Sequence, residues 1–276
     1  MEVNTTNNVA NNLAVVIGAM KSGTTSIYSY FKHHRDITLT RNKECDFFKD
    51  EQLYQKGHEW YESLFDKPAS RYIDVSPNYS KRHIFPGVAE KLADYAPQAK
   101  IIYIMRNPVD RMISHYMHNQ SAGRVHCSFN SLLKKEKRRN YILSSCYAWQ
   151  LEEYEAHFSK DQIFPILFEE FIADPGNTMN RIYQYLGLVE IDGNVDYTNV
   201  EHQGSHKSRP SFIDTNFSHA KINTRLKKVL PGRFSKRRRI VRPHLSKRKR
   251  RQLMQLFKED IQQLEQKYNL DCSVWR

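Results

Sequence analysis

The chain has 276 residues and a formal net charge of +13 at pH 7. This length is close to the size at which single hydrophobic cores stop growing, so we expect one domain. The excess of Lys and Arg predicts a surface that attracts anions, whether nucleic acid, acidic lipid, polyanionic sugar or phosphorylated nucleotide. The four cysteines show no CxxC or Cys/His ligand spacing, which argues against a zinc site or a disulfide framework and favours a reducing compartment.

The first segment, residues 1–12, is polar and rich in Asn. It has neither the basic start nor the apolar stretch of a signal peptide, so we expect a disordered lead-in and a cytoplasmic protein without a membrane span. The apolar run 13–17 then predicts a buried strand that stops at Gly18. A turn rich in Gly, Ser and Thr follows, and the apolar residues of 26–31 have the spacing of a helix.

The later segments repeat this alternation of strand and helix. We expect strands at 101–105 and 163–168, and helices at 87–95, 108–119, 147–158, 178–186 and up to residue 268. Such alternation predicts an α/β fold, with a single domain over 13–276 whose central, mainly parallel sheet is flanked by helices. Residues 231–251 contain many basic and no acidic side chains, and we expect them to form a basic loop before the C-terminal helix.

The turn after the first predicted strand reads Gly-Ala-Met-Lys-Ser-Gly-Thr-Thr from Gly18 to Thr25. A Gly-containing turn from a buried strand into a helix places backbone N–H groups around an anion, so this segment predicts a phosphate site. In the Walker A sequence the lysine follows the second glycine directly, whereas here Lys21 comes before Gly23. The lysine position therefore disfavours an ATPase.

This turn resembles the 5′-phosphosulfate loop of the sulfotransferases that use 3′-phosphoadenosine-5′-phosphosulfate (PAPS). The resemblance implies a P-loop-like turn that binds PAPS without a metal, with Lys21 neutralising charge on the bridging oxygen as the sulfuryl group leaves. The residues that it implies for donor binding are Lys21, Ser22, Gly23, Thr24, Thr25 and Ser26.

A second anion site is expected after the strand at 101–105, where Arg106 places a fixed cation beside a helix. The string from Arg106 to Ser114 resembles the second signature of the same family, in which the first Arg and a Ser eight residues later bind the 3′-phosphate. The resemblance implies these roles for Arg106 and Ser114.

The transfer also needs a base that takes the proton of the acceptor. The segment 43–48 resembles the Lys-Glu-x-x-Phe-Phe segment of heparan-sulfate-type sulfotransferases, which implies that Glu44 is this base, with Phe47 and Phe48 giving it an apolar surround. A solvated Glu in a charged loop is the alternative. His118 follows Ser114 by four residues, and in N-sulfating members a histidine at the matching place lies near the reaction centre.

Three further features bear on the donor and the acceptor. Lys207 and Arg209 fall where the family has a basic loop that closes over the nucleotide, which implies donor binding by both. Val75 stands where glycan-sulfating animal enzymes commonly have a lysine, which argues against a long acidic glycan as acceptor. The C-terminal sequence resembles that of bacterial sulfotransferases and suggests a bacterial source.

We thus predict a sulfotransferase that moves a sulfuryl group from PAPS to a hydroxyl or amine of an unidentified carbohydrate, lipid or small metabolite. A P-loop kinase or NTPase is one alternative, and Asp74 would be its acid for Mg²⁺. A non-catalytic nucleic-acid or membrane-surface binder built on the basic run 236–251 is the other. The donor site favours the sulfotransferase, for which no nucleic-acid partner is expected.

Overall fold

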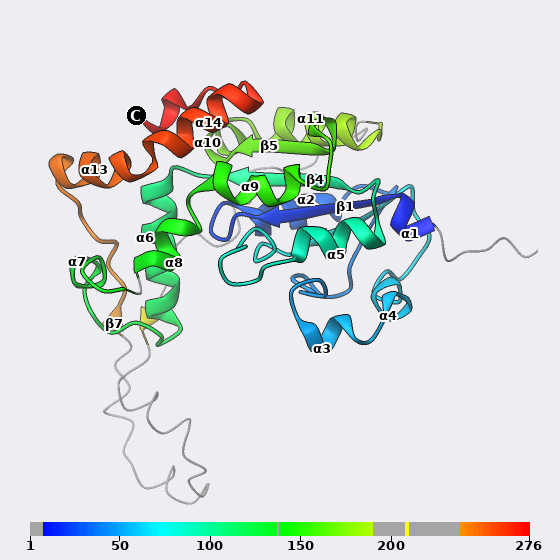
Figure 1. The fold of residues 1–276 in the computed structure, drawn as a ribbon, viewed down its shortest axis with the longest axis horizontal. Coiled ribbons are helices and arrows are strands. Elements are labelled where there is room, and N and C mark those ends of the chain that lie inside the picture. The colour runs from blue at the N-terminus through cyan, green and yellow to red at the C-terminus, as the bar shows by residue number, and fades with distance from the viewer. Residues whose placement is uncertain (1–7, 137, 190–207, 210–237) are drawn as a thin grey trace, which may run out of the picture.

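A computed structural model describes residues 8–136, 138–189, 208–209 and 238–276 of the chain (Figure 1). A short helix, α1 (Asn8–Asn11), precedes a five-stranded sheet of order β2-β3-β1-β4-β5 whose strand pairs are all parallel. The strands are β1 (Leu13–Gly18), β2 (Ile37–Leu39), β3 (Arg71–Val75), β4 (Lys100–Met105) and β5 (Ile163–Leu167). The predicted α/β class with a parallel sheet is confirmed.

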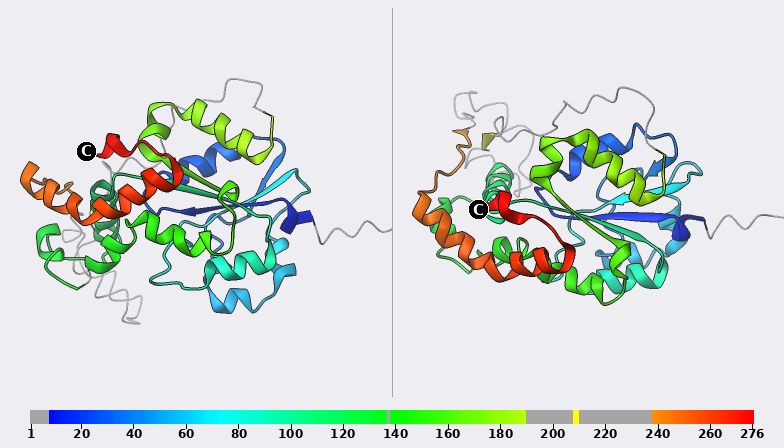
Figure 2. Two further views of the ribbon diagram at one scale, coloured as in Figure 1. Left: turned by 45° about the horizontal axis from the view of Figure 1, so that its top comes forward. Right: turned by 90° about the horizontal axis from the view of Figure 1, so that it is seen from above.

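The sheet is buried on both faces, as the continuous apolar runs predicted. Leu13, Val15 and Ile17 of β1 belong to one core cluster, whereas Ala14 and Val16 belong to the other. Figure 2 shows α2 and α11 on one face of the sheet and α5, α9 and α14 on the opposite face. The carboxyl ends of β1, β3 and β4 therefore open at one edge between two helical layers.

The helices match most of the predicted segments. Their bounds are α2 (Thr24–Phe31), α3 (Glu51–Tyr54), α4 (His58–Glu62), α5 (Val88–Tyr95), α6 (Pro108–Ser121), α7 (Phe129–Leu132), α8 (Arg138–Leu143), α9 (Tyr147–Glu155), α10 (Phe168–Ala173), α11 (Pro175–Leu186), α13 (Lys247–Met254) and α14 (Lys258–Tyr268). The strand predicted over 163–168 ends one residue earlier, because α10 begins at Phe168. No helix in the described segments is both long and apolar enough to cross a bilayer.

The basic run differs from the expected loop over 231–251. From Lys247 onward the chain is helical, because the Ser246 side chain accepts a hydrogen bond from the N–H of Lys249 and caps α13. Leu253 then anchors this helix in the core. The C-terminal helix is not continuous, since a 3₁₀ turn at Gln255–Phe257 separates α13 from α14.

Asp260 of α14 caps the N-terminus of α9. Its carboxylate accepts hydrogen bonds from the backbone N–H groups of Ala148 (3.2 Å) and Trp149 (2.9 Å). Burial of the carboxyl group raises the pKa of Asp260 to about 6, and these N–H groups oppose the rise. The unfolded chain binds this proton less tightly, so the stabilisation linked to it is present at low pH and is lost as the pH rises through 6.

We therefore expect the free energy of unfolding to fall less for Asp260→Asn than for the wild type as the pH rises from 4 to 8. The wild-type carboxylate uses a different oxygen for each N–H group, so the amide keeps one of the two hydrogen bonds, but it buries no charge. The shift from 3.8 to about 6 corresponds to about 3 kcal/mol between acid and neutral pH. Thermal unfolding across pH 4 to 8 checks this, with Asp260→Ala as the control that loses the cap. A difference between wild type and Asp260→Asn that does not change with pH would contradict it.

Candidate active site

The turn between β1 and α2 is shaped by two residues in left-handed backbone conformations. Lys21 has φ 78°, and Gly23, the residue before α2, has φ 88° and ψ 9°. A Cβ at Gly23 would lie 2.9 Å from the Phe168 ring, so no larger residue fits there without a shift. The N–H of Ser26 donates to the carbonyl of Gly23 (3.0 Å), so the donors that the start of α2 leaves outside its own helix are the N–H groups of Thr24 and Thr25. The structure thus folds Gly18–Thr25 into a tight turn at the start of α2, where the sequence predicts a phosphate cradle.

Two buried polar atoms at this turn lack hydrogen-bond partners among the described residues. Ser22 is fully buried and its Oγ has no partner, and the same is true of the Nε of Arg106. Buried donors are almost always satisfied in folded proteins, so a pair of unsatisfied ones beside a cradle of N–H groups fits a bound oxyanion. The residues present are therefore compatible with the phosphates of a nucleotide.

Arg106 lies at the carboxyl end of β4, where sequence analysis placed it. Its guanidinium stands 4.6 Å from the centre of the Phe168 ring and donates a hydrogen bond to the backbone oxygen of Lys21 (3.4 Å). Burial lowers the pKa of Arg106, with Asp110 opposing, but arginine stays charged in proteins. No carboxylate of the described residues lies within 4 Å of it, so its charge is available to an anion.

A second arginine, Arg111, supports the turn from behind and was not singled out in the sequence. It is completely buried, donating to the Ser145 hydroxyl (2.5 Å), to the Tyr141 carbonyl (2.7 Å) and to the carbonyl of Met20 in the turn (3.4 Å). These acceptors are neutral, so a full positive charge is buried next to the cradle. Its place five residues after Arg106 was visible in the sequence, but its burial was not.

Glu44 is brought to the same edge by the segment after β2. Its backbone N–H donates to the carbonyl of Val75 (3.1 Å) at the end of β3. Lys43 bridges the two segments, because its Nζ donates to Oε1 of Glu44 (3.1 Å) and to the hydroxyl of Thr25 (2.9 Å). The structure therefore places the predicted base beside the predicted phosphate turn, and adds Lys43 between them.

The expected apolar surround of Glu44 is absent, which corrects that part of the prediction. The Glu44 side chain is 41% exposed and paired with Lys43. Phe47 and Phe48 are buried in the core, where Phe47 stacks on Tyr61 at 4.7 Å between ring centres. Glu44 itself has a left-handed backbone conformation, with φ 61°.

Asp74, the acid that a kinase would need, is committed to the protein interior. It is fully buried and accepts hydrogen bonds from the hydroxyls of Ser76 (2.6 Å), Tyr79 (3.1 Å) and Tyr61 (3.3 Å) and from the thiol of Cys45 (3.2 Å). Burial raises its pKa, which these donors oppose. The carboxylate thus fixes the segment that carries Glu44 and does not face the phosphate turn, which disfavours the kinase alternative.

Helix α6 contributes Ser114 and His118, four residues apart and both half-buried, and thus one turn apart on the same side. Between them His115 is buried, with its ring 4.4 Å from that of Tyr141. Burial lowers the pKa of His115 strongly, and the charges of Arg111, His118 and Lys21 among its neighbours lower it further. The predicted His118 and Lys21 thus lie around one buried imidazole that sequence reasoning missed.

The remaining predicted donor residues are only partly covered. Lys207 lies outside the described residues. Arg209 belongs to β6 (Ser208–Arg209), which pairs antiparallel with β7 (Arg238–Arg239) and lies against α6. The backbone of this short ribbon is therefore near the helix that carries Ser114.

The basic C-terminal segment packs on the first turn of α6. The carboxylate of Asp110 pairs with Arg242 (2.5 Å) and with Arg250 of α13. Arg242 is also among the charges that lower the pKa of Arg106. Part of the basic run is thus structural and adds positive potential to the Arg106 end of the site.

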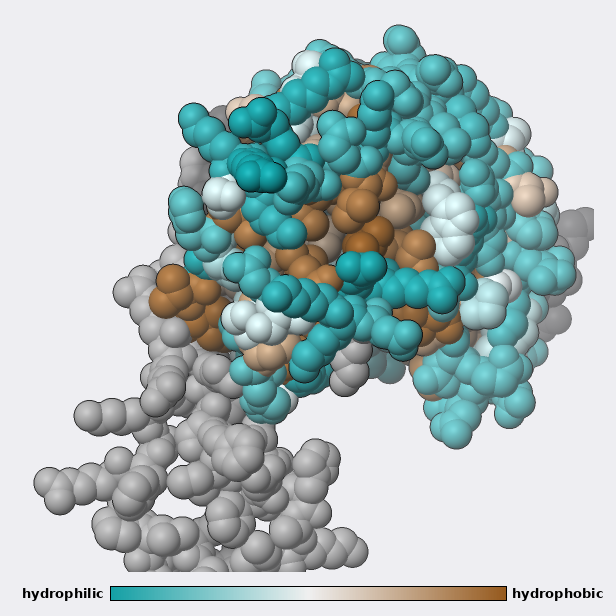
Figure 3. Space-filling view, turned by 60° about the vertical axis from the view of Figure 1, so that its left-hand side comes forward, coloured by the Kyte–Doolittle hydropathy of each residue, from teal (hydrophilic) through white to brown (hydrophobic). Residues whose placement is uncertain are grey.

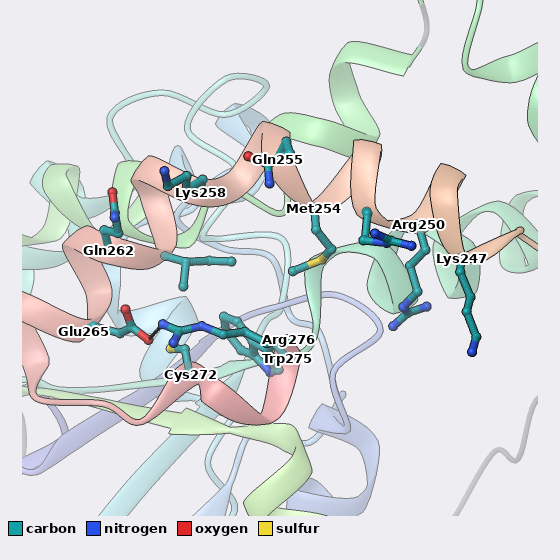
Figure 4. A pocket seen from close by; sticks show the side chains of 12 residues that line it. Lys247, Arg250, Met254, Gln255, Lys258, Gln262, Glu265, Cys272, Trp275 and Arg276 are labelled. Atoms are coloured by element: carbon teal, nitrogen blue, oxygen red, sulfur yellow. Dashed lines mark hydrogen bonds and ion pairs between the residues drawn. The ribbon is translucent and has the colours of Figure 1, made fainter.

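A separate pocket of about 790 Å³ lies between α13, α14 and the C-terminus (Figure 4). Met254, Ile261 and Trp275 give it an apolar lining, while Lys247 and Arg251 are among the cations at its border. None of the predicted site residues lines it. Figure 3 shows the side of the molecule on which α13 and the C-terminus lie, where apolar surface occupies a central area bordered by hydrophilic residues.

Within the described part of the chain, no group of three His, Cys, Asp or Glu side chains is arranged to hold a metal ion. The four cysteines are free thiols. The described cations at the candidate site are the side chains of Lys21, Lys43, Arg106 and Arg111.

The chain is similar in sequence to curated sulfotransferases. The bifunctional heparan sulfate N-deacetylase/N-sulfotransferase 1 of Xenopus laevis is 27% identical over 194 residues, or 63% of this chain and 22% of the relative. The heparan sulfate glucosamine 3-O-sulfotransferase 3B1 of Mus musculus is 28% identical over 187 residues, or 64% of this chain and 46% of the relative. The chain thus spans less than half the length of these curated relatives.

Solved structures resemble the chain over nearly its whole length. A sulfotransferase from Alicyclobacillus acidocaldarius superimposes with a TM-score of 0.71 and 26% identity, covering 96% of this chain and 98% of that one. Mouse sulfotransferase SULT7A1, solved in complex with PAP, shares the fold with a TM-score of 0.52 at 16% identity, covering 91% and 84%. The sulfotransferase domain family model matches residues 12–265, and the chain therefore belongs to the sulfotransferase domain family.

Proposed function

We propose that this chain is a PAPS-dependent sulfotransferase whose donor site is the edge of the sheet where β1, β3 and β4 end. The observation that carries the proposal is the turn whose buried Ser22 hydroxyl lacks a hydrogen-bond partner among the described residues. It lies next to the Arg106 guanidinium, which has no described carboxylate within 4 Å, and Thr25 of the turn accepts a hydrogen bond from Lys43 of the Lys43–Glu44 pair. Family membership and the shared fold with a PAP-bound sulfotransferase support the same nucleotide.

The two phosphates of the donor would be held by different elements. The 5′ end would bind the N–H groups and hydroxyls of the turn up to Ser26, with Lys21 at the bridging oxygen. The 3′-phosphate would bind Arg106 and Ser114, and Lys207 and Arg209 are the proposed closing cations. Arg111 would act from behind the turn, because it touches Met20 and raises the local positive potential.

The reaction would be an in-line displacement at sulfur. A lone pair of the acceptor hydroxyl or amine forms the new bond to sulfur, the bond from sulfur to the bridging oxygen breaks, and PAP leaves. The acceptor proton passes to Glu44, which Lys43 holds toward the turn, and His118 is a second candidate for contact with the reacting group. Lys21, Arg106 and the backbone N–H groups would stabilise the developing charge without a metal.

The acceptor is proposed to be a carbohydrate, lipid or small metabolite in the bacterial cytoplasm, where free thiols persist. Both curated relatives described above are named for heparan sulfate. Val75, however, is fully buried in the core under α2 and α11 and offers no cation to an acidic chain. We therefore propose a small or weakly charged acceptor and no nucleic-acid partner.

Arg106→Ala is expected to weaken binding of PAP by about 2–5 kcal/mol, because it removes a buried charge that pairs with the 3′-phosphate. Binding of adenosine 5′-phosphate, which lacks that group, should change little. Arg71→Ala is the matched control. Arg71 is also partly buried, but it lies at the start of β3 and donates a hydrogen bond to the Leu186 carbonyl. Equal losses for both nucleotides would contradict the assignment.

Calorimetric titration with PAP, adenosine 5′-phosphate and Mg·ATP tests the proposed donor site without knowledge of the acceptor. The proposal predicts that PAP binds in the micromolar range or tighter without a metal, and at least about tenfold more tightly than adenosine 5′-phosphate. Preference for Mg·ATP would favour the kinase. Absence of PAP binding, with strong salt-dependent binding of nucleic acid, would favour the non-catalytic binder.

A further inference from the structure

Lys81 is a buried lysine to which the proposed function gives no role. The segment after β3 runs along the phosphate turn, because Ser80 donates its backbone N–H to the carbonyl of Ile17 (2.9 Å). The Lys81 side chain follows this direction and is only 6% exposed. Its Nζ donates to Oδ1 of Asn78 (2.7 Å) and lies 3.2 Å from the sulfur of Met20, the residue before Lys21.

The ammonium group of Lys81 is poorly satisfied by these partners. It has three N–H donors, and of its two contacts the thioether of Met20 is only a weak acceptor. No described carboxylate lies within 4 Å of it, so it has no ion-pair partner in that part of the chain. A buried charge without a partner is costly, so this arrangement favours the neutral amine until an anion arrives.

Charged and titratable groups surround Lys81 on several sides. They are Arg111 and His115 of α6, Glu44, Asp46 and Lys49 of the segment after β2, and His83 two residues away. Burial, Arg111 and Lys49 lower the pKa of Lys81 to about 7, while Glu44 and Asp46 oppose the shift. Near pH 8 about nine-tenths of the side chains are therefore neutral.

Lys81 lies near two features of the proposed site, the phosphate turn and Glu44. Its Nζ contacts the turn at Met20 and also feels the charge of Glu44, the proposed base. The sulfuryl group of a bound donor has to lie between these two features, because the acceptor oxygen that Glu44 deprotonates attacks its sulfur. A cation on this line meets sulfuryl oxygens rather than the 3′-phosphate at Arg106.

We propose that Lys81 contacts the transferred sulfuryl group together with Lys21, and that it takes up a proton from solvent when PAPS enters the site. This inference rests on the proposed function and adds a second lysine to it. Lys81 donates a hydrogen bond to a sulfuryl oxygen while the bond to the bridging oxygen breaks, and it keeps its proton throughout. Since PAP has no sulfuryl group, PAP charges Lys81 less than PAPS does.

Proton uptake during calorimetric titration tests this directly. PAPS and PAP are titrated near pH 8 in two buffers of different ionisation enthalpy, a pH at which free imidazoles are neutral. The wild type is expected to take up close to one proton with PAPS and clearly less with PAP. Lys81→Met is expected to lose the uptake, and so is Lys81→Arg, because arginine is charged before the donor binds.

Lys91→Met is the matched control, because Lys91 is a partly buried lysine that pairs with Glu51 at 2.7 Å and is not among the charged groups named above around Lys81. It should retain the PAPS-linked uptake. Lys81→Met should also slow formation of PAP by about 10²-fold, with Lys81→Arg recovering part of the rate. Undiminished uptake in Lys81→Met and Lys81→Arg overturns the inference, whereas a wild type that fails to bind PAPS at all overturns the proposed function instead.

Discussion

Replacement of Lys21 by alanine is expected to slow PAP formation from PAPS by about 10²- to 10³-fold, the effect of removing one preorganised donor from a developing negative charge. Lys21 lies in the turn whose carbonyls contact Arg106 and Arg111, so its own ammonium is the part that alanine deletes. Alanine keeps the Cβ, so the cost of holding this residue at a φ of 78° is the same as for lysine. PAP affinity should fall much less than the rate.

The rate is measured with labelled PAPS, and PAP affinity by calorimetry on the same variant. Lys32→Ala is the control, because Lys32 follows α2 and covers the Tyr28 ring at 4.7 Å, away from the turn. Its turnover should equal that of the wild type. A Lys21→Ala variant that keeps its turnover but loses PAP binding would make Lys21 a binding residue only.

Glu44→Gln is expected to lower transfer to a hydroxyl acceptor by about 10²- to 10⁴-fold, because the amide cannot take the proton. The substitution preserves size, and its amide oxygen can still accept from Lys43. Donor binding should persist, since Glu44 does not line the phosphate cradle. The rate is measured at saturating PAPS over a range of pH.

Asp46→Asn is the matched variant for this experiment. Asp46 carries the same charge in the same segment, has nearly the same left-handed φ of 59°, and pairs with Lys49 at 2.7 Å. Burial raises the pKa of Asp46, with Lys49 opposing, so it is the competing candidate for the base. Loss of turnover in Asp46→Asn, with full activity in Glu44→Gln, would transfer the role to Asp46.

The fold was largely predictable because its central strands are buried on both faces. The apolar runs over 13–17 and 101–105 became β1 and β4, the neighbours at the middle of the sheet. β2 has only three residues, Ile37–Leu39, and such a length carries no periodicity. The start of α13 within the basic run was also missed, because the cap by Ser246 is a local signal that a composition argument overlooks.

The site was predictable where a residue has a fixed place relative to a strand end. Arg106 follows β4 directly and Lys21 comes three residues after β1, and parallel strands bring their carboxyl ends to one edge. Arg111 and Lys81 were not predictable, since their importance comes from burial against Met20 by segments far apart in the chain. The surround of Glu44 was predicted wrongly, because Phe47 and Phe48 pack into the core while the Glu44 side chain stays 41% exposed beside Lys43.

The most direct test of the account is the fate of the sulfuryl group. Wild type and Lys21→Ala are incubated with sulfur-labelled PAPS and a panel of hydroxyl and amine acceptors, and PAP and labelled product are quantified. The account predicts stoichiometric PAP and sulfated product with at least one acceptor, without added metal, at a rate about 10²-fold higher in the wild type. Tight binding of PAPS with no label leaving it for any acceptor or for water would contradict catalysis and leave a nucleotide-binding domain.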